Sequence, residues 1–229
     1  THGMAEHSVE EVRRFVGNGV RRLMERAVPD GADHPHFEET LATFQQHYMA
    51  HSLDRTRPYE GIPETVRELK RRGCHLAVVS NKFYAATQEL VRHFFPEIAV
   101  AIGEHEAEGI RKKPAPDTVM EAFRQLGVGQ EDAVYVGDSD VDLLTARNSG
   151  LPCISVLWGF RDRDFLLAHG ATTLVESPAA LLDEHPLPRC PLIRQSHPSD
   201  CSDKRRHLFT PITPMLYSSI SHHLRPNPL

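Results

Sequence analysis

From residue 75 to residue 183 the sequence alternates between short apolar runs and segments with helical spacing. Strands that alternate with helices indicate βαβ units and a parallel sheet. We therefore predict an α/β protein with a Rossmann-like parallel sheet core in three α/β/α layers. The predicted strands cover 75–80, 98–103, 133–137, 153–159 and 172–175, and the predicted helices cover 82–94, 116–126, 140–149, 162–169 and 177–183.

The residues before this core have a purely helical pattern. Apolar side chains recur at helical spacing over 8–28 and 36–52. Ser8 and Glu11 have the spacing of a capping box at the start of the first helix. We predict a helical cap domain over residues 1–57.

The α/β core is predicted over residues 58–184, and the character of the chain changes after it. Residues 185–229 are rich in proline and serine and have no sustained periodicity, which predicts a disordered tail. A second interpretation is that the tail is an out-of-frame extension of the gene.

Charge and composition exclude several classes of partner. The 229 residues carry a formal charge of −5 and show no basic stripe, so no nucleic acid partner is expected. No apolar stretch approaches the ~18 residues of a membrane span, and no signal-peptide pattern opens the chain. Cys74 and Cys153 begin apolar runs and are interpreted as reduced core residues. These features predict a cytoplasmic protein without a membrane partner, and they leave a homo-oligomer open.

Polar residues follow several predicted strands at the carboxyl edge of the sheet, where ligands bind in such folds. Asp138, Asp140 and Asp142 come after the strand 133–137, and clustered carboxylates need a cation, a proton or a basic group beside them. The spacing lacks the glycine and glutamate of an EF-hand calcium loop, whereas Mg²⁺ needs only one or two carboxylates plus phosphate oxygens. The alternative is that Asp138 or Asp140 only caps the following helix.

Three further groups fall at this edge. Ser80 and Asn81 end a strand with a hydroxyl and free backbone N–H groups, which suit an oxyanion, although they could merely cap the next helix. Lys113 precedes a proline that restricts its backbone to extended geometry, so it could neutralise phosphate or be an ordinary loop residue. Trp158-Gly159 lies at the end of a fourth strand.

The order of these motifs resembles the haloacid dehalogenase-like hydrolase superfamily, and in particular its phosphoglycolate phosphatase-like members. The segments VVSNK (78–82), RKKPAPD (111–117) and VYVGDSDVDLLTARNSGLP (134–152) carry the resemblance, which covers about residues 4–184. It implies a Mg²⁺-dependent phosphomonoester hydrolase that acts on a small phosphorylated metabolite through an aspartyl-phosphate intermediate. A related sugar-phosphate phosphatase or phosphomutase is the neighbouring possibility.

The resemblance also implies roles for individual residues. Asp138 would be a direct Mg²⁺ ligand, and Asp142 would orient the waters of the metal or Lys113. Phosphate oxygens would bind Ser80 and the amide of Asn81, and Lys113 would bridge nucleophile and phosphate. Gly17, Asn18 and Gly19 would lie on the cap face that closes over the substrate, or would only interrupt a helix.

One family motif is absent from the sequence. The DxDGT motif, which follows the first core strand and carries the nucleophile, is not found, and neither Ser80 nor Ser139 is expected to have an adjacent base. The resemblance places the missing strand in the middle of the sheet, so its loss would leave two neighbours unpaired. We predict an inactive, marginally stable chain unless the tail or another copy inserts a strand in the gap. A non-catalytic phosphate- or metal-binding fragment is the alternative function.

Overall fold

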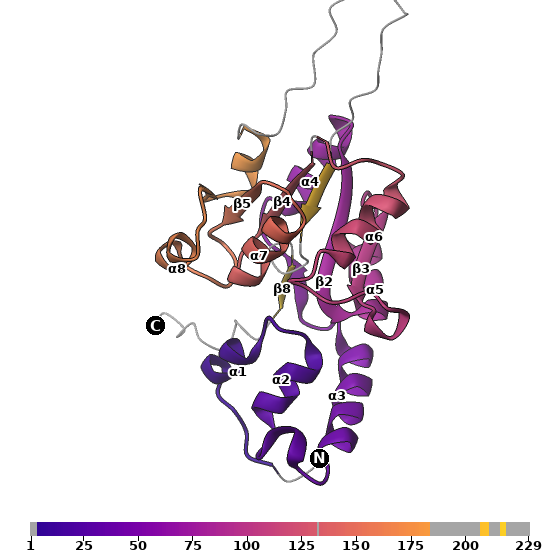
Figure 1. Ribbon diagram of the computed structural model, residues 1–229, viewed down its shortest axis with the longest axis vertical. Helices are drawn as coiled ribbons and strands as arrows, with labels where there is room; N and C mark the ends of the chain where they lie inside the picture. Colours follow the sequence, from indigo (N-terminus) through magenta and orange to yellow (C-terminus); the bar gives the residue numbers. More distant parts are fainter. Residues whose placement is uncertain (1–3, 132, 184–206, 211–215, 219–229) are drawn as a thin grey trace, which may run out of the picture.

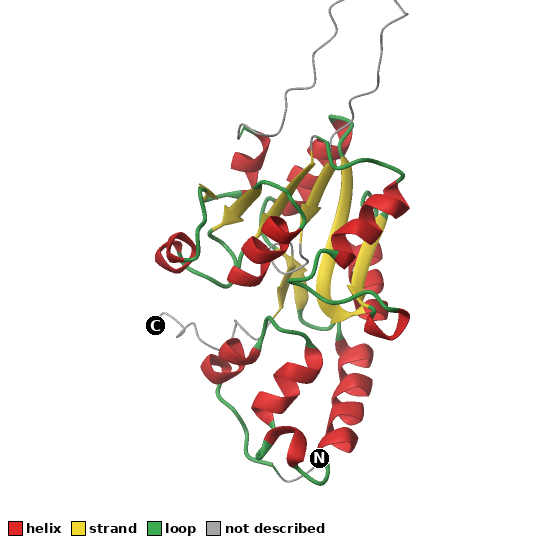
Figure 2. Cartoon of the chain, in the orientation of Figure 1, coloured by secondary structure: helices red, strands yellow, loops and turns green. Residues whose placement is uncertain are grey.

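The computed structural model describes residues 4–131, 133–183, 207–210 and 216–218. Its core is one parallel sheet in the order β3-β2-β7-β4-β5-β6 (Figure 2). This confirms the predicted α/β class. The strands are β2 (His75–Phe83), β3 (Val100–Glu104), β4 (Ala133–Gly137), β5 (Cys153–Val156), β6 (Thr173–Val175) and β7 (His207–Thr210).

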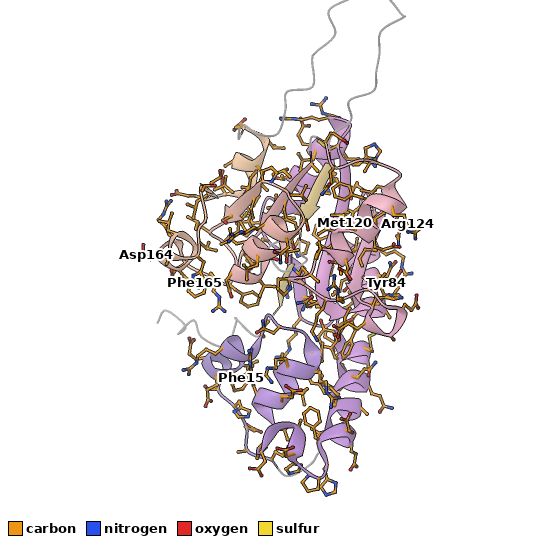
Figure 3. The ribbon with its side chains drawn as sticks, in the orientation of Figure 1. Phe15, Tyr84, Met120, Arg124, Asp164 and Phe165 are labelled. Carbon is orange, nitrogen blue, oxygen red and sulfur yellow. The ribbon has the colours of Figure 1, made fainter. Side chains whose placement is uncertain are left out.

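Helices cover both faces of the sheet, because alternate residues of each strand point to opposite sides. One buried cluster joins Val78 and Val134 to α4 (Ile62–Arg71), α5 (Tyr84–Phe94) and the 3₁₀ helix η3 (Pro178–Leu182). The other joins Val79 and Tyr135 to α6 (Asp117–Leu126) and α7 (Asp140–Asn148). These are the three layers that the alternation predicts, although the last predicted helix, 177–183, is a 3₁₀ helix. The remaining elements are η2 (Glu106–Glu108) and α8 (Arg163–Ala168), whose Phe165 lies on the other side of the core from Tyr84 (Figure 3).

Strand β7 comes from the tail and lies between β2 and β4. It pairs in parallel with both, with Phe209 in register with Ala77 on one side and with Tyr135 on the other. The structure therefore shows a strand from the tail inserted into the sheet, which is one of the two ways in which we expected the gap to be filled. The predicted disordered tail therefore contains two short strands, β7 and β8 (Leu216–Ser218), and the rest of 185–229 lies outside the described residues. Unpaired backbone on two buried strands favours even a short segment as a partner.

The cap packs α1 (Val9–Phe15), α2 (Val20–Ala27) and α3 (Phe37–His51) at one end of the molecule (Figure 1). The predicted capping box is confirmed, since Ser8 N–H donates to Glu11 and Glu11 N–H donates to Ser8 Oγ. Met24, Val28 and Phe37 form a small apolar core inside the cap. The cap also contains η1 (Gly31–Asp33), and β1 (Thr56–Pro58), at its junction with the core, pairs antiparallel with β8.

Several strand ends differ from the prediction by one to three residues, and the two largest differences lie at the carboxyl edge. β2 continues three residues beyond 80 to Phe83, and α5 begins at Tyr84 instead of 82. β5 ends at Val156, before the predicted 159, so that the following turn can approach β4. Among the described residues, no helix is long and apolar enough to cross a membrane. Cys74 and Cys153 are free thiols, as interpreted.

Candidate active site

The carboxyl edge of the sheet opens into a cavity of about 250 Å³ that the cap covers. All eight residues to which the family resemblance gives a site role line it, so the structure brings together segments that are far apart in the chain, whereas Trp158 and Gly159 are not among the lining residues. The eight are Gly17, Asn18, Gly19, Ser80, Asn81, Lys113, Asp138 and Asp142. The five core residues among them are buried, which sets them in an environment of low effective dielectric.

An ion pair between Lys113 and Asp142 lies at the floor of the site. Lys113 Nζ donates to Asp142 Oδ1 at 2.8 Å, and both side chains are buried. The carboxylate of Asp142 also accepts from Tyr135 OH, Ser139 Oγ and the backbone N–H of Asp138. Burial alone would raise the pKa of Asp142, but the charge and hydrogen bond of Lys113 outweigh it and hold that pKa below its usual range. Of the two roles expected for Asp142, the contacts favour orienting Lys113.

The side chain of Asn81 forms two hydrogen bonds with the backbone of Lys113 and so holds it near the end of β2. Its Oδ1 accepts from Lys113 N–H at 2.8 Å, and its Nδ2 donates to Lys113 O at 2.9 Å. The same Nδ2 donates to Gly17 O of the cap at 3.2 Å. The sequence suggested only the backbone amide of Asn81, so this side-chain role was missed. One amide thus connects the Lys113 loop, the central sheet and the cap.

Asp138 follows β4 and is almost completely buried, with its Oδ2 accepting from Phe160 N–H at 2.9 Å. Gly159 makes this contact possible, because a Cβ at that position would overlap the Asp138 carboxylate. Burial first, and then the negative charge of Asp142, raise the pKa of Asp138 to about 8. A carboxyl group in this position is stabilised in its charged form by a nearby cation.

Helix α7 is capped by Ser139, not by the neighbouring aspartates. Its side chain accepts from Asp142 N–H at the first turn. The alternative that Asp138 or Asp140 only caps this helix is therefore wrong. Asp140 instead lies 3.6 Å from Arg161, at the rim of the cavity.

The expectation that neither Ser80 nor Ser139 has an adjacent base is wrong for Ser139. Its Oγ donates to Asp142 Oδ2 at 2.6 Å. The lowered pKa of Asp142 makes that carboxylate a poor proton acceptor. Ser80 Oγ accepts from Lys82 N–H at 3.1 Å, which keeps its own proton available for a ligand.

The donor set fits Mg²⁺ through Asp138. Mg²⁺ is commonly held by one or two carboxylates together with phosphate oxygens and waters. Asp138 is buried, and burial together with the negative charge of Asp142 raises its pKa. Within the described part of the chain, no group of three or more His, Cys, Asp or Glu side chains could hold a metal ion. A Mg²⁺ ion held through Asp138 would therefore take its remaining ligands from phosphate oxygens and waters.

Several residues at the site were not predicted, and four of them make contacts that matter for the site or line it beside the predicted residues. Tyr135 and Phe160 contact the two aspartates, whereas Tyr48 and Lys82 line the cavity. Tyr135 lies on a strand that was recognised, but only the tertiary structure shows that its hydroxyl reaches Asp142. Lys82 is part of the VVSNK segment, where its position two residues after Ser80 was the available signal.

These features define an α/β protein with a cavity at the carboxyl edge of a parallel sheet, lined by buried polar and charged side chains of the core and by residues of the helical cap. Residues 1–156 match the model of the family described as haloacid dehalogenase-like hydrolase. The chain belongs to this family.

Its relatives place it among the phosphatases of the family. It is 32% identical to the phosphoglycolate phosphatase of Aquifex aeolicus over 69% of this chain and 72% of that protein. It is 30% identical to phosphoglycolate phosphatase 1 of Pseudomonas aeruginosa, over 79% of this chain but only 65% of that enzyme. A solved structure from Lactobacillus delbrueckii, provisionally assigned as a phosphoglycolate phosphatase, superimposes with a TM-score of 0.70 and 36% identity, covering 77% of this chain and 82% of that one.

Proposed function

We propose that the cavity binds the phosphate group of a small monoester together with Mg²⁺, in the manner of a phosphomonoester hydrolase whose substrate is 2-phosphoglycolate. The observation that carries the proposal is the convergence of Ser80, Lys113 and Asp138, all buried, in one capped cavity. The names of two relatives, both phosphoglycolate phosphatases, support the substrate. We propose a cytoplasmic location for the protein as well.

Each residue has a physical task in this proposal. The Ser80 hydroxyl and the N–H of Asn81 donate to phosphate oxygens, and the Lys113 ammonium neutralises their charge. Asp142 and Asn81 keep Lys113 in place, as their contacts show. Asp138 would hold Mg²⁺, which when bound compensates charge on the phosphate oxygens. The cap excludes water from the site.

We also propose that the 229-residue chain by itself does not hydrolyse the ester. Among the described residues that line the cavity, the carboxylates are Asp138, Asp140 and Asp142. Asp138 is the candidate metal ligand, Asp140 pairs with Arg161, and Asp142 pairs with Lys113. None is left to attack phosphorus, so we expect binding without turnover.

Calorimetric titration of the purified chain with inorganic phosphate, in the presence of Mg²⁺, tests the binding site. We expect saturable binding that weakens at least tenfold in Lys113→Met, because that variant loses a charge-assisted contact. The matched control is Lys70→Met, an exposed residue of α4. Absence of phosphate binding by the unmodified chain would contradict the site.

A second assay follows phosphate release from 2-phosphoglycolate with Mg²⁺. We expect no release above the Lys113→Met background, and clear hydrolysis would refute the proposed inactivity. Competition against bound phosphate by sugar phosphates separates the alternative substrates. We expect 2-phosphoglycolate to compete best.

A further inference from the structure

A second cationic group lies in the cavity, on the side where the cap meets the core. Lys82, near the end of β2, and Tyr48, on α3 of the cap, both line the cavity and are both half-buried. Lys82 Nζ donates to Tyr48 OH at 3.3 Å and lies 5.7 Å from the centre of the Tyr48 ring. The pair therefore joins the two parts of the protein across the cavity.

Lys82 differs from the other cations that line the cavity. Lys113 pairs with Asp142 at 2.8 Å, and Arg161 lies 3.6 Å from Asp140. Among the described residues, Lys82 has no carboxylate within ion-pair distance, and its recorded polar side-chain partner is a neutral phenol. A half-buried ammonium with only a neutral partner retains donors and charge for an anion.

Tyr48 adds a second donor to the same place. Because its oxygen accepts from Lys82, its own proton is free to be donated. Beside this pair the cavity wall has an apolar side chain from the cap, Phe44, whose ring stacks on Tyr48 with the ring centres 5.9 Å apart. An apolar surround strengthens a charge-assisted hydrogen bond.

We infer that Lys82 and Tyr48 form a subsite for a second anionic group of the substrate, so that the site selects small phosphate esters carrying a carboxylate or another acid. The inference rests on the proposed phosphate site of Ser80 and Lys113. Because the two halves of the subsite come from the cap and the core, a ligand that fills it also holds the cap closed.

Two ligands of similar size test the subsite. 2-Phosphoglycolate carries a carboxylate where ethyl phosphate carries a methyl group, and both keep the phosphate. Calorimetric titration of the 229-residue chain, with Mg²⁺ at a fixed concentration, gives a Kd for each ligand. We expect 2-phosphoglycolate to bind at least tenfold more tightly.

In Lys82→Met we expect this ratio to fall to within about twofold of one, while the Kd of ethyl phosphate changes little. Tyr48→Phe should lower the ratio partly, and Lys82→Arg should retain most of it. The exposed Lys70→Met is the control for a lost positive charge. A purely structural role of Lys82 would weaken both ligands equally, so the ratio separates the two roles even if the variant is less stable.

The outcomes distinguish this inference from the proposed function. If inorganic phosphate binds but the two esters bind with equal Kd, the subsite is overturned and the proposed phosphate site is not. A ratio that persists in Lys82→Met but disappears in Arg161→Met assigns the second anion to Arg161 and also overturns it. Failure of inorganic phosphate to bind overturns the proposed phosphate site, and the subsite with it.

Discussion

Burying Lys113 and Asp142 has both an unfavourable and a favourable effect on the free energy of unfolding. Each charge loses hydration on burial, and the pair recovers that loss through a 2.8 Å contact and the surrounding donors. Removing one partner leaves the other buried without compensation. The same contact that positions Lys113 for phosphate therefore also makes the floor of the site sensitive to substitution.

We expect Lys113→Met to lower the free energy of unfolding by about 3–5 kcal/mol, because Asp142 keeps its charge in a buried position. Urea denaturation followed by circular dichroism measures the change. Arg67→Met is the matched control, since it breaks an exposed pair with Glu64 and should have a much smaller effect. Equal effects of the two substitutions would contradict the strong coupling of the buried pair.

Gly159 provides a second test at the scale of one residue. A methyl group there would overlap the carboxylate of Asp138, so the turn after β5 must move away from β4. We expect Gly159→Ala to cost about 1–3 kcal/mol and to weaken Mg²⁺-dependent phosphate binding. Gly129→Ala is the control, because its methyl group would meet only the end of the Glu131 side chain, which can swing away. A fully stable Gly159→Ala that binds phosphate normally would show that this close approach is unimportant.

At the scale of single elements, β7 is a short strand on which the continuity of the whole sheet depends. Its four residues pair with β2 and three of them also pair with β4, so that one short segment connects two halves of the sheet. The ladders run from His207 to Thr210 on the β2 side and from His207 to Phe209 on the β4 side. Without these pairs the backbones of two buried strands would have no partner in the middle of the core.

Comparing Phe209→Pro with Phe209→Ala isolates the backbone contribution of β7. Both variants lose the aromatic side chain, but only proline removes the backbone N–H and restricts the backbone dihedral angle. We expect the proline variant to be less stable than the alanine variant by about 3 kcal/mol or more. Thermal and urea unfolding measure the difference, and equal stabilities would mean that β7 does not contribute to the sheet in solution.

Elements of the core could be predicted because their signals are local. The apolar run 133–137 matches β4 residue for residue, and the break at Gly17 and Gly19 separates α1 from α2 as expected. β7 could not be predicted, since a four-residue strand in a segment rich in proline and serine has no periodicity to detect. The sheet selects it by offering unpaired neighbours on both sides.

Some features of the candidate site could likewise be predicted from the sequence, and others could not. The edge position of Ser80, Asp138 and Lys113 follows from strand order, whereas the Asn81 clamp depends on contacts between residues 32 positions apart. Such contacts have no signature in sequence spacing. Sequence reasoning therefore predicted that these residues lie at one edge of the sheet, but not the interactions that hold them there.

At the scale of the whole molecule, the cap, the sheet and the tail depend on one another. The cap reaches the sheet through Asn81 and Gly17, and the tail reaches the cap–core junction through β8, which pairs with β1. The tail also reaches the middle of the sheet through β7. A ligand in the cavity contacts cap and core together, so its binding should stabilise an assembly to which the tail already contributes.

Deleting the tail tests this dependence directly. We compare a chain ending at Asp183, which lacks both tail strands, with a chain ending at Ser218, which retains them. Because β2 and β4 lose their common partner, we expect the shorter chain to lose cooperative unfolding, and the longer one to unfold as the full chain does. Calorimetry and amide hydrogen exchange of Val78 and Val134 report the result. If the chain ending at Asp183 unfolds at the same temperature as the full chain, with the same protection at these amides, the tail is not a structural part of the sheet.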